Sequence, residues 1–197
     1  TQRQLRWTAF DDALETIKRI NSEADYYINI MSHKDMVDKD TGKFTEYGTA
    51  TLGLHNTNYE SYLSQAKAYQ DEYNDLMLKI AKGEESIADE NVIQRLRDLQ
   101  DAHRDARESA ENELQSIQDL VKQGYEAQLD ALSKLIDKFK KLKNNALDYY
   151  KYAKSIIEKT KQIAALQKQL TAFGDNDSEE SRAQIQKLKV ELQDATD

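Results

Sequence analysis

Residues 59–80, "YESYLSQAKAYQDEYNDLMLKI", carry the most regular apolar pattern in the chain. Their apolar side chains recur in alternating steps of three and four residues, which places them on one face of an α-helix. A capping box formed by Thr57 and Glu60 predicts the start of this helix, and Gly83 predicts its end. The stretch therefore predicts a helix whose apolar face must be buried. That face consists of Tyr59, Tyr62, Ala66, Tyr69, Tyr73, Leu76 and Ile80.

Similar spacing extends over most of the remaining chain. A first helix is expected within residues 1–31, where Asn21 is the one polar residue on the apolar face. A very long helix is expected from Asn91 to Phe173, with Gly124 as a candidate break because an interior glycine weakens a helix. A short helix within residues 174–197 is expected to return antiparallel and pack on the end of the long one.

The composition indicates an all-α protein. Of the 197 residues, 32% are charged and none is proline, a bias typical of long helices and coiled coils. We expect elongated helical hairpins or a coiled coil, with one irregular loop near residues 35–58. The predicted organisation is a helical hairpin over 1–83, the long helix over 84–173 and the return helix over 174–197. Because the sequence starts without methionine and stops in mid-pattern, we expect it to be part of a longer chain.

Apolar helix faces of this kind also predict self-association. Heptad seams bury their apolar residues between helices of different chains as readily as within one chain. The mixture of Tyr, Ala, Leu and Ile does not choose between two, three or six strands. The predicted partner or oligomer seam comprises Tyr59, Tyr62, Tyr69, Tyr73, Leu76, Ile80, Phe139, Leu142, Tyr149, Ile156 and Ile163.

The loop near residues 35–58 invites a comparison with calcium-binding loops. An EF-hand beginning at Asp38 would need glycine at its sixth position and glutamate at its twelfth, but Lys43 and Thr49 stand there. We therefore predict a polar turn, in which Asp38 or Asp40 accepts backbone hydrogen bonds and Gly42 adopts positive φ. Its apolar flanks, Phe44, Tyr47, Leu52 and Leu54, are expected to anchor it on the first two helices.

The charge is distributed unevenly. The net charge is −8, yet residues 134–168 hold ten lysines and three acidic residues. One interpretation is a solvated helix face on which lysine stems cover apolar surface. The alternative is contact with an acidic surface or with nucleic acid. The candidate residues for that contact are Lys138, Lys140, Lys141 and Lys143.

No pattern in the sequence predicts catalysis. There is no cysteine, no glycine-rich phosphate loop and no nucleophile elbow. His33, His55 and His103 lie in three separate segments without metal-ligand spacing. No apolar run is long enough to span a membrane. We therefore predict a non-enzymatic protein without catalytic residues, metal or cofactor.

Three stretches of the chain resemble a known family. "LRWTAFDDALETIKRINSEADYYINIMS" and then "DKDTGKFTEYGTATLGLHNTNYESYL" are similar to a segment of the tail tape measure proteins of tailed bacteriophages and prophages of Gram-positive gut bacteria. "KTKQIAALQKQLTAFGDNDSEESRAQIQKLKVELQDA" is similar to the segment that follows it in the same proteins. The resemblance covers nearly the whole chain in the same order, and its most specific part is Gly48–His55.

The resemblance implies a structural role. Such proteins are long and mostly helical, lie in several copies inside the tail tube, set tail length and leave with the DNA at infection. The implied partners are copies of the chain itself, tail tube and tail-tip proteins, and the DNA end within the tail. The implied location is the tail lumen of the virion, after synthesis in the bacterial cytoplasm. The alternative is a helical protein-binding module of a surface or tail-tip adhesin, which would display the Gly48–His55 loop.

Overall fold

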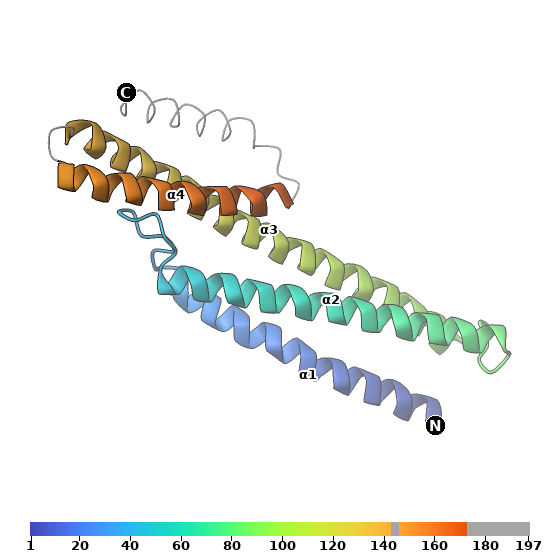
Figure 1. Cartoon of the computed structure of the whole chain (residues 1–197). Helices are drawn as coiled ribbons and strands as arrows, with labels where there is room; N and C mark the ends of the chain where they lie inside the picture. Colours follow the sequence, from blue (N-terminus) through green and yellow to red (C-terminus); the bar gives the residue numbers. More distant parts are fainter. Residues whose placement is uncertain (143–145, 173–197) are drawn as a thin grey trace. The chain divides into compact units, whose positions relative to one another are not determined.

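The computed structural model describes residues 1–142 and 146–172, which form four helices. These are α1 (Gln2–Met31), α2 (Glu46–Ala81), α3 (Glu90–Lys141) and α4 (Ala146–Ala172), as Figure 1 shows. The only pairing of extended backbone within these residues is an isolated bridge between Val37 and Phe44. The predicted all-α fold is therefore confirmed, whereas a coiled coil is not established. The predicted return helix over 174–197 lies outside the described residues.

The helices belong to two compact units. The first comprises Thr1–His33 and Thr51–Ile117, and the second comprises Lys34–Ala50 together with the chain from Gln118 onward. Thus α2 and α3 each contribute to both units. Each unit buries its own apolar cluster.

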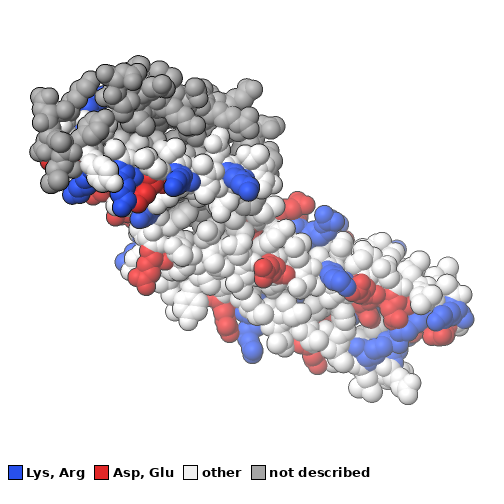
Figure 2. Space-filling view, viewed as in Figure 1, with Lys and Arg blue, Asp and Glu red and all other residues white. Residues whose placement is uncertain are grey.

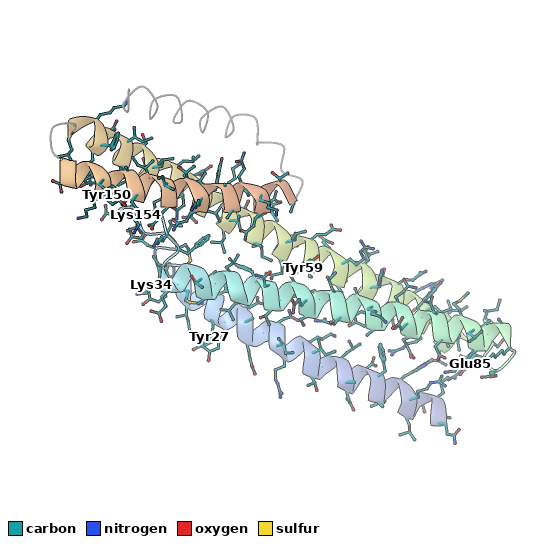
Figure 3. All side chains as sticks on the ribbon, in the orientation of Figure 1. Tyr27, Lys34, Tyr59, Glu85, Tyr150 and Lys154 are labelled. Carbon is teal, nitrogen blue, oxygen red and sulfur yellow. The ribbon has the colours of Figure 1, made fainter. Side chains whose placement is uncertain are left out.

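The first unit is a bundle of α1, most of α2 and the first part of α3. Leu14 of α1, Leu76 of α2 and Leu99 of α3 belong to one buried cluster. At one end, the Arg3 guanidinium lies 2.8 Å from carboxylate oxygens of Glu85 and of Asp89, in and next to the α2–α3 turn; Glu85 is labelled in Figure 3. These ion pairs fix the start of α1 against that turn.

Helix α2 starts earlier and is longer than predicted. It begins at Glu46, so the irregular segment is Ser32–Thr45 and not residues 35–58. The Thr45 hydroxyl oxygen accepts a 3.0 Å hydrogen bond from the Gly48 N–H, as an N-cap residue does. Thr57, the predicted cap, instead lies inside the helix and donates its hydroxyl to the Gly53 carbonyl. Gly83 does follow the helix end, with φ of +74°.

The second unit contains the loop Lys34–Thr45, the later part of α3, and α4. Its buried cluster joins Ile136 and Phe139 of α3 to Ile156 and Ile163 of α4. In an unbroken helix, residues 139 and 163 would lie about 36 Å apart at about 1.5 Å per residue, too far to share a cluster. The long helix expected from Asn91 to Phe173, with Gly124 as its candidate break, is therefore two helices, and α3 ends at Lys141 instead of near Gly124. Burial of both apolar faces favours two helices packed on each other over one exposed rod.

Gly124, the predicted break, lies inside α3 and serves another purpose. A Cβ atom at this position would lie 2.6 Å from Cζ of Phe44, so the absence of a side chain lets the Phe44 ring pack on the helix. The loop is therefore anchored on α3, which was not predicted, and the Phe44 ring also lies against α2, where a Cβ at Gly48 would be 3.1 Å from its Cδ1 atom. Gly42 has the predicted positive φ, at +68°. A Cβ there would lie 2.5 Å from the Ala127 carbonyl oxygen, so this turn also lies directly against α3.

Candidate functional site

The predicted oligomer seam lies mostly inside the chain's own units. Tyr69 and Leu76 are buried in the first unit, and Tyr73 and Ile80 pack partly buried against them. Phe139, Ile156 and Ile163 are buried in the second unit. Because these side chains already have partners within the chain, they pack between its own helices, and their assignment to a seam with other copies stays a prediction.

The other predicted seam residues do not belong to these buried groups. Tyr59, Tyr62 and Leu142 are half-buried. The Tyr149 side chain lies outside the described part. None of these four residues carries an argument for self-association.

The lysine group lies at the end of α3. Lys138, Lys140 and Lys141 are exposed in its last turn, where positive charge interacts favourably with the helix dipole. Lys143 lies outside the described residues. Over the described, coloured part of the face in Figure 2, basic and acidic side chains are interspersed.

The acidic turn is held by its own backbone. The Asp38 carboxylate oxygen Oδ1 accepts hydrogen bonds from the N–H groups of Asp40, at 2.9 Å, and of Thr41, at 2.8 Å. These backbone bonds, chiefly the one from Thr41, lower the pKa of Asp38. Residues 1–142 and 146–172 contain no group of three histidine or acidic side chains arranged to hold a metal ion. The prediction that Asp38 accepts local backbone bonds is confirmed.

The candidate site is a layer of polar side chains that crosses the first unit, with a buried centre and with Asp25, His55 and Glu113 towards its edges. It is formed by Asn21 and Asp25 of α1, by His55, Asn58, Ser61 and Gln65 of α2, and by Glu113 of α3. We call these seven residues the polar layer. It interrupts an otherwise apolar interface, so its side chains must satisfy one another.

Asn21 and Asn58 form the centre of the polar layer. The Asn21 amide Nδ2 donates to Asn58 Oδ1 at 3.0 Å. Its oxygen Oδ1 accepts from the Ser61 hydroxyl at 2.8 Å and from Gln65 Nε2 at 2.7 Å. Both asparagines are buried, and Asn58 has no exposed surface. These bonds tie α1 to α2 in one register, since sliding either helix by a turn would leave buried amides without partners.

Asn58 also connects the layer to charged groups. Its amide Nδ2 donates to the Asp25 carboxylate at 2.7 Å and to Glu113 Oε1 at 3.2 Å. The other oxygen of Glu113 lies 2.6 Å from Nδ1 of His55, which donates to the carboxylate. Burial, together with the negative charges of Asp25 and Glu113, raises the pKa of Tyr62 beside the layer. The carboxylates of Asp25 in α1 and Glu113 in α3 therefore both bond to the Asn58 amide of α2, and Glu113 also bonds to the His55 imidazole.

Sequence reasoning found only part of the polar layer. Asn21 was recognised as a polar residue on an apolar face, whereas Asn58, Gln65 and Glu113 were not singled out. A signal was present, because Asn58, Ser61 and Gln65 are spaced three and four residues apart and therefore share a face of α2 beside its apolar seam. The two remaining histidines lie elsewhere: His33 is exposed, and His103 Nδ1 lies 2.9 Å from the Ala66 carbonyl oxygen.

The fold and the polar layer define an all-α chain built of helical bundles. Neither a protein-family model nor a curated protein nor a solved structure matches the chain. Within the described residues, no helix combines the length and the apolar character needed to cross a membrane.

Proposed function

We propose that this chain is a non-enzymatic structural segment of a phage tail tape measure protein, the class of protein that sets tail length and leaves at infection. The observation that carries the proposal is the sequence resemblance, which covers nearly the whole chain and is most specific at Gly48–His55. Under this proposal the chain works inside the tail tube, with further copies of itself, tube and tip proteins and the DNA end as partners.

Two features of the folded chain support a structural role. The described residues form helices that bury their apolar faces in two clusters, which gives the chain stable helical units. The polar layer adds specificity, because buried polar groups that satisfy one another favour one helix register over shifted alternatives. In a tube that holds several copies, a fixed register gives every copy the same dimensions.

The resemblance also gives Gly48–His55 a role in this proposal. Gly48 lies where a Cβ would be 2.0 Å from the Met36 carbonyl oxygen, so a side chain there would collide with the preceding loop. His55 joins the polar layer through Glu113. The most specific part of the resemblance therefore coincides with residues that fix the start of α2.

The alternative function is a helical protein-binding module of a surface or tail-tip adhesin. One observation favours it: large apolar side chains are exposed on α1, among them Tyr26, Tyr27 and Ile30. Tyr27 is labelled in Figure 3. Such a group is a frequent feature of protein contact surfaces. The displayed loop expected at Gly48–His55 is replaced by helix, which removes the original reason for this alternative.

Accessibility to antibodies distinguishes the two functions. Antibodies raised against the 197-residue chain are applied to intact virions of the parent phage and to tails opened by mild denaturation. A tape measure segment lies inside the tube, so gold label is expected only on opened tails. Label on the tip or surface of intact virions would contradict the proposal and favour the adhesin.

A further inference from the structure

A buried lysine in the second unit forms no ion pair within the described residues. Lys159 of α4 is 8% exposed, and its ammonium Nζ donates to the Thr41 carbonyl in the loop. An ammonium has three N–H donors, and no carboxylate of the described residues forms an ion pair with this one. Burial lowers the pKa of Lys159, and nearby Lys43 lowers it further, against an opposing effect of Asp38. The side chain therefore has donors that are not satisfied by carboxylates.

The same lysine lines a hollow of about 250 Å³. The loop, α3 and α4 of the second unit form its walls. The hollow is partly open to solvent, and Ala131 and Leu135 are the apolar residues of its lining. Its charged and amide groups are Asp40, Lys43, Glu158, Lys159 and Gln162.

A second polar group in the hollow also lacks a partner. The amide oxygen Oε1 of Gln162 is buried and accepts no hydrogen bond from residues 1–142 or 146–172. Buried polar atoms without partners are uncommon in folded proteins and destabilise them. The hollow thus presents spare ammonium donors and an unused amide acceptor one helical turn apart on α4, at residues 159 and 162.

We propose that this hollow binds a small amino acid or a similar amino carboxylate. The carboxylate accepts hydrogen bonds from the Lys159 ammonium, and the amino group donates to Gln162 Oε1. The balance of charge supports a zwitterion, because the two lysines in the hollow are matched by the carboxylates of Asp40 and Glu158. This inference is independent of the proposed tail function.

The test is a titration of the full chain carrying ¹³C-labelled lysine, followed by nuclear magnetic resonance at the lysine Cε position. The probes are glycine, acetate, methylammonium and inorganic phosphate. Glycine is expected to shift the Lys159 signal saturably and to bind at least ten times more tightly than acetate or methylammonium, since each of these offers only half of the contacts. Lys159→Met identifies the signal and is expected to abolish binding.

Two further variants separate recognition from general attraction. Gln162→Leu is expected to weaken glycine about tenfold and acetate little, because only glycine donates to the amide oxygen. Lys154→Met, on the same helix and exposed, is the matched control and is expected to leave every affinity unchanged; Lys154 is labelled in Figure 3. Circular dichroism establishes that each variant is folded.

Three outcomes would overturn the proposal. Glycine could leave the Lys159 signal unmoved, in which case water alone satisfies the two groups. Phosphate could bind more tightly than glycine, which would mean that the amino group is not recognised. Glycine and acetate could bind the wild-type chain equally, a result that decides the matter even if Lys159→Met fails to fold.

Discussion

Asn58→Ala tests whether the polar layer holds the first unit together. The substitution removes the amide that donates to Asp25 and Glu113 and that accepts from Asn21. Net contributions are about 1.5–3 kcal/mol for a hydrogen bond to a charged group and about 1 kcal/mol for a neutral one. Asp25 is exposed and is hydrated by water in the variant, so the bond from Asn58 to Asp25 contributes at the low end of the range for charged groups.

The expected total loss is about 3–5 kcal/mol, including the lost side-chain bond from Asn21, whose amide keeps only a 3.4 Å bond to the backbone carbonyl of residue 58, and the small cavity. That is a large part of the roughly 5–15 kcal/mol by which domains are stable. Trp7 is the only tryptophan and lies in the first unit, so its fluorescence reports on that unit. In urea, the unfolding midpoint should fall by about 2 M, for a slope near 1.5–2 kcal/mol/M.

The matched control is Asn56→Ala on the same helix. Asn56 is exposed and bonds only to the Leu52 carbonyl of its own helix, so its removal should change stability by less than about 0.5 kcal/mol. A double variant with Asn21→Ala should lose less than the sum of the two single losses, because both residues act in one network. If Asn58→Ala behaves like Asn56→Ala, the polar layer has no energetic role and the reasoning is refuted.

The remaining predictions concern the space around two glycines of α2 and two ionisable groups whose pKa values are shifted. Gly48→Ala should destabilise the chain by about 1–3 kcal/mol, because its methyl group would collide with a backbone oxygen. Gly53→Ala lies in open space on the same helix and should stabilise the chain by up to about 1 kcal/mol. Equal effects of the two substitutions in urea unfolding would contradict this prediction. Asp38→Ala should destabilise the loop at pH 7 and do so less below about pH 4, because a carboxyl group with a lowered pKa stabilises the fold only while it is ionised. A difference in thermal midpoint between variant and wild type that does not change with pH would contradict this prediction. Lys159→Met should raise the thermal midpoint at pH 7 and raise it by less at pH 10, because a lysine with a lowered pKa destabilises the fold while it is protonated. A thermal midpoint below that of the wild type at pH 7 would disprove this prediction.

Periodicity predicted the helices well, since the spacing of apolar residues is fixed by the helix itself. Periodicity was less successful in predicting the residues at which the helices begin and end. Nothing in the seam from Phe139 to Ile163 distinguishes one long helix from two packed helices, because both bury the same face. Asn144 and Asn145, which favour turns, were the available signal for a break between α3 and α4. Gly124 was misinterpreted because its role depends on Phe44, which is far away in sequence.

The polar layer and the hollow depend on distant residues in the same way. The pairing of Asn58 with Asn21 follows from tertiary packing, and no local pattern specifies it. His55 was considered as a metal ligand and as the end of the Gly48–His55 stretch, and neither interpretation predicted its bond to the carboxylate of Glu113. Lys159 belongs to the lysine-rich stretch 134–168, for which a solvated helix face was one of two interpretations, and only the packing of the loop on α4 shows that it is buried.

The most direct test of the tape measure proposal is tail length, measured by electron microscopy in the parent phage after in-frame deletion of residues 129–163. The deletion removes 35 residues and most of the second apolar cluster. If α3 and α4 stay paired in the tail, the loss should be about 20–27 Å; if they open into one helix, it should be about 50 Å, at about 1.5 Å per residue. Either shortening supports a length-setting role. Viable tails of unchanged length would contradict it.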